Sequence, residues 1–142
     1  MKIVINNQYG GFSLSAEAIE EYLKLKGKKV YFYELDIRGE ELRYRKTSKG
    51  ENEPFVTCFT KDFGAEIAQD SISDEEWEKY MFDTKEIQRT DKDLIEVIKK
   101  LGEKANTMCS SLKIIEIPDD VDWVIEEYDG AEWVAERHRT WG

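Results

Sequence analysis

The spacing of hydrophobic residues along the chain predicts three helices. In the segment from residue 16 to about 26, Ile19 and Tyr22 fall on one apolar face, and Ser15 is placed to cap the start. A shorter helix is predicted after Ser73, because the sequence SDEE is a capping box, and it ends near Tyr80.

The third helix has the strongest pattern. It is predicted to start at residues 90–93 and to stop at Gly102, which can leave the helical conformation at little cost. Its buried face is formed by Leu94, Ile95, Val97, Ile98 and Leu101.

Alternating, aromatic and β-branched runs predict strands between these helices. A turn at residues 38–40 suggests one hairpin, and Asp129-Gly130 is typical of a second hairpin turn. The predicted strands are 2–6, 30–35, 42–45, 55–60, 112–117, 121–128 and 132–139. The sum is one α+β domain over residues 1–142, a largely antiparallel sheet packed by two or three helices.

Charge narrows the choice of partners. The 142-residue chain has a formal net charge of -10 and an isoelectric point near 4.7, which disfavours DNA, RNA or an anionic membrane as the general partner. An anionic ligand would need a local basic pocket. No apolar run approaches a membrane span, and Cys58 and Cys109 form no CxxC pair, so we expect a cytoplasmic protein with reduced thiols.

The stretch VINNQYGGFSLS, residues 4–15, permits two interpretations. Gly10 and Gly11 lie between a strand and a helix start, where free backbone N–H groups can hold a phosphate. Glycine and serine also serve a plain strand-to-helix connection. The spacing matches neither nucleotide-binding glycine motif, so the sequence leaves both interpretations open.

The last predicted strand has two candidate faces. Glu132, Glu136 and His138 alternate along one face and could hold a metal, or could be a solvated surface. The other face carries Arg137 and Arg139, which suit a phosphate beside an aromatic ring or could pair with the many acids. We favour the solvated interpretation from the residues alone. No catalytic motif is present, and no cofactor is implied.

The two ends of the chain resemble a known family. They are similar to the phage Thoeris anti-defence sponge family, the first described type. The similar stretches are KIVIN and YGGFSLS at the start, QRTDKDLIEVIKKLGEKAN at 88–106 and LKIIEIPDDVDWVIEEYDGAEWVAERHRTW at 112–141. Residues 38–75 carry no matching motif.

The resemblance implies a binding protein that is not an enzyme. Members of that family sequester cyclic ADP-ribose isomers in the infected host cell, and some also hold cyclic oligonucleotides in separate pockets. They are homo-oligomers built from dimers and assembled into hexamers. The matched stretches, with Phe82 just upstream and the aromatic Trp141 at the end, give these candidate ligand-binding residues: Asn6, Gly10, Gly11, Phe12, Phe82, Arg89, Asn106, Arg137, Arg139 and Trp141.

Within this set, two residues also have simple structural explanations. Asn106 could cap the preceding helix, and Arg89 could pair with an acid at the next helix start. Four tryptophans in the second half of the chain predict a homo-oligomer with the last third in the interface. The alternatives to a sponge are a small nucleotide hydrolase that uses Glu132, Glu136 and His138, and an acidic phage accessory protein that binds a host protein.

Overall fold

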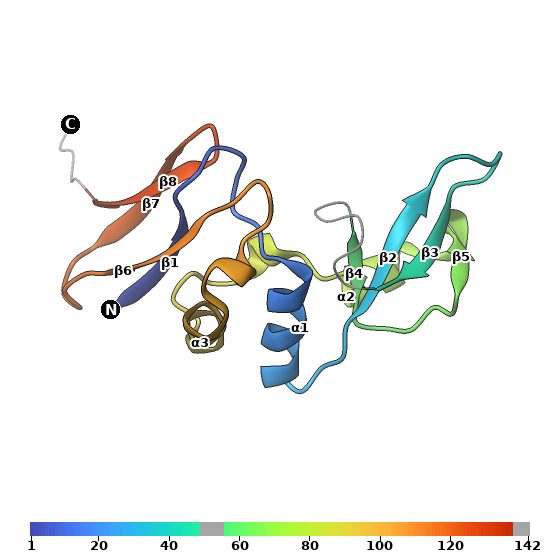
Figure 1. The fold of residues 1–142 in the computed structure, drawn as a ribbon, viewed down its shortest axis with the longest axis horizontal. Coiled ribbons are helices and arrows are strands. Elements are labelled where there is room, and N and C mark those ends of the chain that lie inside the picture. The colour runs from blue at the N-terminus through green and yellow to red at the C-terminus, as the bar shows by residue number, and fades with distance from the viewer. Residues whose placement is uncertain (49–55, 138–142) are drawn as a thin grey trace.

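The molecule is elongated, with helices α1 and α3 in the middle and strands at both ends (Figure 1). This computed structural model describes residues 1–48 and 56–137. We call the part with strands β1, β6, β7 and β8 and helices α1 and α3 the aliphatic lobe, and the part with strands β2 to β5 and helix α2 the aromatic lobe. The predicted α+β class, with antiparallel strands packed by helices, is confirmed.

The aliphatic lobe joins the two ends of the chain. Strand β1 pairs antiparallel with β6, so that Lys2 lies opposite Glu116, and β7 and β8 form a separate hairpin beside β1. The elements of this lobe are β1 (Lys2–Asn6), α1 (Ala16–Leu25), α3 (Lys92–Leu101), β6 (Leu112–Glu116), β7 (Trp123–Tyr128) and β8 (Ala131–Glu136).

The aromatic lobe is a four-stranded antiparallel sheet in the order β4-β2-β3-β5, with α2 packed on one face. Its elements are β2 (Tyr31–Asp36), β3 (Arg43–Thr47), β4 (Thr57–Phe59), β5 (Glu66–Ala68) and α2 (Asp74–Tyr80). Three short 3-10 helices lie between these elements. Gln69–Ser71 lies between β5 and α2, Thr84–Glu86 lies between α2 and α3, and Gly102–Ala105 lies between α3 and β6.

Each lobe has its own core. The core of the aliphatic lobe is formed by α1, α3 and β1, and the opposite face of the four-stranded sheet contributes Phe32 and Cys58 to it. The core of the aromatic lobe contains Tyr33, Tyr44 and Phe59 under α2, all less than a tenth exposed. The alternation of side chains along β2 therefore places Phe32 and Tyr33 in different cores.

The predicted helix boundaries are confirmed. The Ser15 hydroxyl accepts a hydrogen bond from the Ala18 amide, and Ser73 and Glu76 form the predicted capping box. Helix α3 ends at Gly102, whose φ of 56° favours glycine.

Three features of the strands differ from the sequence prediction. The predicted strands 121–128 and 132–139 are shorter, since β7 begins at Trp123 and β8 ends at Glu136. Strand β5 (Glu66–Ala68) was not predicted, because three residues are too few to show an alternating pattern. The strands also divide into three sheets, a division that local patterns do not encode. In the described residues, no helix has the length and apolar character needed to cross a membrane.

Candidate functional site

Half of the predicted site residues, five of the ten, gather at one junction. Here the glycine loop after β1 meets the turn of the β7–β8 hairpin, and the Gly10 amide donates a hydrogen bond to the Asp129 carbonyl at 3.1 Å. A Cβ on Gly130 would lie 2.8 Å from the Gly10 nitrogen and would overlap the Gly11 amide. Gly10 and Gly11 have φ of 123° and 100°, which favour glycine, so the chain-turning interpretation explains both glycines without a ligand.

Arg89 and Glu132 form a buried ion pair at the same junction. The two guanidinium nitrogens donate to the two carboxylate oxygens at 2.6 and 2.9 Å, and the side chains are 18% and 9% exposed. The guanidinium lies 3.7 Å from the centre of the Phe12 ring. Arg89 therefore pairs with Glu132 on β8. The expectation that it pairs with an acid at the start of α3 is wrong.

Asn6 completes this junction. Its side-chain amide donates to the carbonyls of Gln8 and Gly130, its side-chain oxygen accepts from the Ser111 amide, and its own backbone N–H donates to Glu132. The side chain is fully buried. Every polar group of the Asn6 side chain thus has a partner within the protein, which explains a buried asparagine without a ligand.

The remaining candidates lie apart from this junction. Asn106 caps the 3-10 helix before it, as expected, since its backbone N–H donates to the Glu103 carbonyl at 3.1 Å. Its side-chain oxygen accepts from the Leu112 amide at 2.8 Å and so closes the loop before β6. Arg137 is exposed, and its guanidinium lies 3.8 Å from Asp122. Arg139 and Trp141 lie outside the described residues.

The proposed metal group is not assembled in the described residues. Both oxygens of Glu132 are bonded to Arg89, Glu136 is exposed, and His138 lies outside the described residues. Within residues 1–48 and 56–137, no group of three or more His, Cys, Asp or Glu residues is placed to hold a metal ion.

Two of the predicted site residues line cavities. Phe82 lines two of them, and Arg89 lines a third, of about 490 Å³, together with Trp123 and Ile125. Of the two cavities at Phe82, the larger, about 440 Å³, lies between α1 and residues 78–87, and the smaller, about 360 Å³, lies on the side of Ala16 and Cys58. The larger cavity is lined by residues that include Tyr22, Lys26, Lys28, Lys79, Tyr80, Phe82, Asp83 and Glu86.

The larger cavity combines aromatic rings with charged groups. The Tyr22 and Phe82 rings lie 6.0 Å apart at an angle of 33°, and the Phe82 amide donates to the Cys58 carbonyl. Lys26 is held by Asp91 and Asp93 at 3.2 and 2.8 Å, and these hydrogen bonds raise the pKa of its ammonium.

The Tyr22 hydroxyl fixes one wall of this cavity. It donates to an Asp91 carboxylate oxygen at 2.8 Å, and burial raises the pKa of the phenol to about 12. Tyr22 therefore stays neutral at physiological pH, and its ring has a defined position. This wall of the cavity is thus tied by a hydrogen bond to Asp91 at the start of α3.

The lysines of this cavity were not among the sequence candidates. The signal was present as KLKGKK at residues 24–29, a basic run in a chain of net charge -10. The helix pattern assigned Tyr22 only to the buried stripe, and a solvated helix end explained the lysines equally well. Residues 78–87 lie against the end of α1, and no local sequence pattern predicts this contact between distant parts of the chain.

Comparisons with known proteins assign neither a family nor a function to this chain. No protein-family model, curated protein or solved structure matches this chain.

Proposed function

We propose that this protein binds a cyclic ADP-ribose isomer and holds it without cleaving it, as a phage anti-defence sponge in the cytoplasm of the infected cell. The observation that supports this most is the cavity of about 440 Å³ at Phe82, which joins aromatic rings to lysines. Its volume lies in the range of ligand pockets.

The chemistry of the cavity suits an adenine nucleotide. Phe82 and Tyr80 offer ring surfaces against which a base can stack, and Lys28 and Lys79 offer ammonium groups for two phosphates. Asp83 and Glu86 can accept hydrogen bonds from ribose hydroxyls. A sponge needs these contacts and needs no nucleophile.

The resemblance supports the same proposal from a different direction. The stretches that carry it, residues 2–15, 88–106 and 112–141, fall in the aliphatic lobe as far as they are described. The unmatched residues 38–75 form most of the aromatic lobe. The residues that line the cavity at Phe82 lie outside the matched stretches, so the resemblance supports the kind of function and the cavity supports its location.

The test is to recover the ligand. Purified protein is titrated with a panel of cyclic ADP-ribose isomers by calorimetry, with and without EDTA, then denatured by heat, and the released material is identified by mass spectrometry. We expect tight binding of one isomer, no effect of EDTA and intact ligand. Cleaved product would support the hydrolase instead, and no binding of any isomer would support the host-protein adaptor.

Variants locate the site. Lys28→Ala removes a charged contact, so we expect about ten- to a hundred-fold weaker binding, whereas Lys113→Ala on the exposed side of β6 should bind normally. Phe82→Leu should weaken binding while keeping an apolar residue at this position. If only Arg139→Ala weakens binding, the ligand lies near the C-terminal end of the chain and not in this cavity.

A further inference from the structure

The second half of strand β2 has an open edge. Strand β4 pairs with β2 only at Tyr31–Tyr33, and within residues 1–48 and 56–137 no strand lies beside Leu35 on that side. At this point the hairpin that β2 forms with β3 projects away from the body of the molecule (Figure 1). We call residues 34–42 the arm.

The pattern of strand pairing shows which backbone groups meet this edge. The Lys46 amide donates to the Ala65 carbonyl on the side of β5, so the neighbouring Arg45 directs its backbone N–H and C=O groups toward β2. Arg45 lies opposite Glu34, so Glu34 directs its backbone groups toward β3, and the next residue, Leu35, directs its own the other way. The N–H and C=O of Leu35 therefore point to the open edge, where a further strand can pair with them.

Apolar surface lies at the same edge. A cavity of about 300 Å³ is found here, on the side of β2 away from β3. Leu35 and Ile37 are 41% and 68% exposed. The Leu35 side chain shares a face of the sheet with its pairing partner Tyr44, which is buried against Trp77 of α2. The cavity is lined by Glu34, Leu35, Asp36, Ile37 and Arg38.

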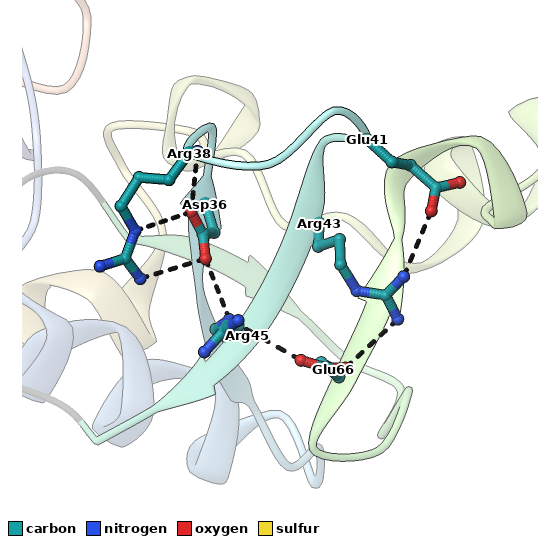
Figure 2. Close-up of polar contacts among 6 residues, drawn as sticks. All are labelled: Asp36, Arg38, Glu41, Arg43, Arg45 and Glu66. Carbon is teal, nitrogen blue, oxygen red and sulfur yellow. Dashed lines mark hydrogen bonds and ion pairs between the residues drawn. The ribbon is translucent and has the colours of Figure 1, made fainter.

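Ion pairs on the face opposite Leu35 hold the arm in shape (Figure 2). Arg38 donates to both carboxylate oxygens of Asp36 at 3.0 and 3.1 Å, and Arg45 reaches the same carboxylate at 3.1 Å. Arg45 also lies 3.7 Å from Glu66 of β5. These contacts, led by the hydrogen bonds from Arg38, lower the pKa of Asp36 to about 2, so its carboxylate stays ionised at physiological pH. The open edge therefore belongs to a hairpin that is already formed.

The arm is acidic. Its sequence, ELDIRGEEL, contains four acidic residues and one arginine, so its formal charge is -3. Arg38 is already paired with Asp36, and Glu40 is exposed at the turn. Lysine and arginine side chains of a partner are attracted to this charge, whereas acidic side chains are repelled. A second copy of the arm would bring four more acids to the same edge, so the charge favours a basic partner.

We propose that the open edge of β2 binds an extended basic segment of a partner protein, which adds to the sheet as a strand beside Leu35. The backbone groups of Leu35 supply hydrogen bonds, and an apolar residue of the segment packs on Leu35 and Ile37. The residues before and after it lie on the other face, beside Glu34 and Asp36, where the charge of the arm selects lysine or arginine. None of the residues of the arm lines either cavity at Phe82, so this contact is independent of the proposed nucleotide site.

The test uses labelled synthetic heptapeptides, whose binding to the purified protein is measured by fluorescence anisotropy. The first alternates lysine and valine, the second alternates glutamate and valine, and the third is the lysine peptide with its central valine replaced by proline. Proline keeps the charge but removes a strand hydrogen bond. We expect the lysine peptide to bind, the proline peptide to bind about tenfold or more weakly, and the glutamate peptide not to bind. No binding of the lysine peptide, or equal binding of the proline peptide, would overturn the proposal.

Variants of the protein locate the contact. Ile37→Ser removes apolar surface and Glu40→Lys reverses a charge, and each should weaken the lysine peptide by about three- to tenfold. The matched controls, Leu25→Ser at an exposed leucine of α1 and Glu103→Lys at an exposed acid after α3, should leave binding unchanged. All four side chains are exposed, so the variants should fold, and circular dichroism checks this. If Glu103→Lys weakens the peptide as much as Glu40→Lys, the peptide responds only to overall charge and the proposal is wrong. None of these outcomes depends on the nucleotide ligand.

Discussion

The two lobes are held together by different kinds of side chain. The aliphatic lobe buries Leu94, Val97 and Ile98 of α3 against α1 and β1, and the largely buried ion pair of Arg89 and Glu132 joins distant parts of the chain. The aromatic lobe has short strands and relies on rings, since Phe59 meets Tyr33 and Trp77 edge-on at 5.5 and 5.6 Å. Short strands offer few positions, so each must bury a large side chain.

This difference affects where a ligand can bind. The larger of the two cavities at Phe82 lies where α1 of the aliphatic lobe meets residues 78–87, which are the end of α2 of the aromatic lobe and the segment after it. Neither lobe builds this cavity alone. A binding site at such a boundary depends on the stability of both cores. The following predictions measure the contribution of each lobe to stability separately.

The largest expected effect comes from removing a core side chain of each lobe. Phe59→Ala deletes a fully buried ring and should lower the free energy of unfolding by about 3–5 kcal/mol, and Leu94→Ala by about 2–5 kcal/mol. We expect Phe59→Ala to be the more costly, because four edge-on or tilted ring neighbours lose a partner. Urea denaturation measures both. A smaller loss in Phe59→Ala would show that the aromatic core collapses around the gap.

The next largest effect is expected from removing one carboxylate of an ion pair in each lobe. Glu132→Gln leaves the Arg89 charge buried without its partner and should cost about 3 kcal/mol. Glu66→Gln in the aromatic lobe removes a carboxylate that is 46% exposed and should cost less than about 1 kcal/mol.

A double variant checks the reason for that difference. Combining Arg89→Met with Glu132→Leu removes both charges, so thermal unfolding should show a higher melting temperature than in Glu132→Gln alone. If the double variant is the less stable, the pair itself, and not the uncompensated charge, holds the β7–β8 hairpin in place.

The sequence predicted the aliphatic lobe better than the aromatic lobe. Helix α3 shows a full apolar periodicity, and Ser15 and Gly102 mark helix ends by local chemistry. Strand β5 and the pairing of β1 with β6 depend on contacts between distant residues, which no local pattern encodes. Among the site candidates, Phe82 and Arg89 both line cavities, but Arg89 and Asn6 also belong to a bonded junction that their residue types alone could not distinguish from a ligand site.

Two glycines with similar backbone conformations test the contact between the glycine loop and the turn of the β7–β8 hairpin, where we expect a smaller effect. Gly130 and Gly64 have φ of 89° and 91°, so alanine is strained at both, but only at Gly130 would the new Cβ overlap the glycine loop. Gly130→Ala should therefore cost about 1–3 kcal/mol more than Gly64→Ala by chemical denaturation. Equal costs would mean that the loop and the hairpin turn can move apart freely.

The smallest expected effect compares the two helix caps. The Ser73 hydroxyl is exposed and caps α2 through the Glu76 amide, so Ser73→Ala should cost about 0.5–1 kcal/mol. Ser15 is buried, and its hydroxyl both accepts from the Ala18 amide and donates to the Lys104 carbonyl at 2.7 Å. Ser15→Ala leaves that carbonyl without its donor, so we expect about 1–3 kcal/mol by urea denaturation. If the two variants unfold at the same urea concentration, the bond to Lys104 adds nothing, and the cap of each lobe acts only on its own helix.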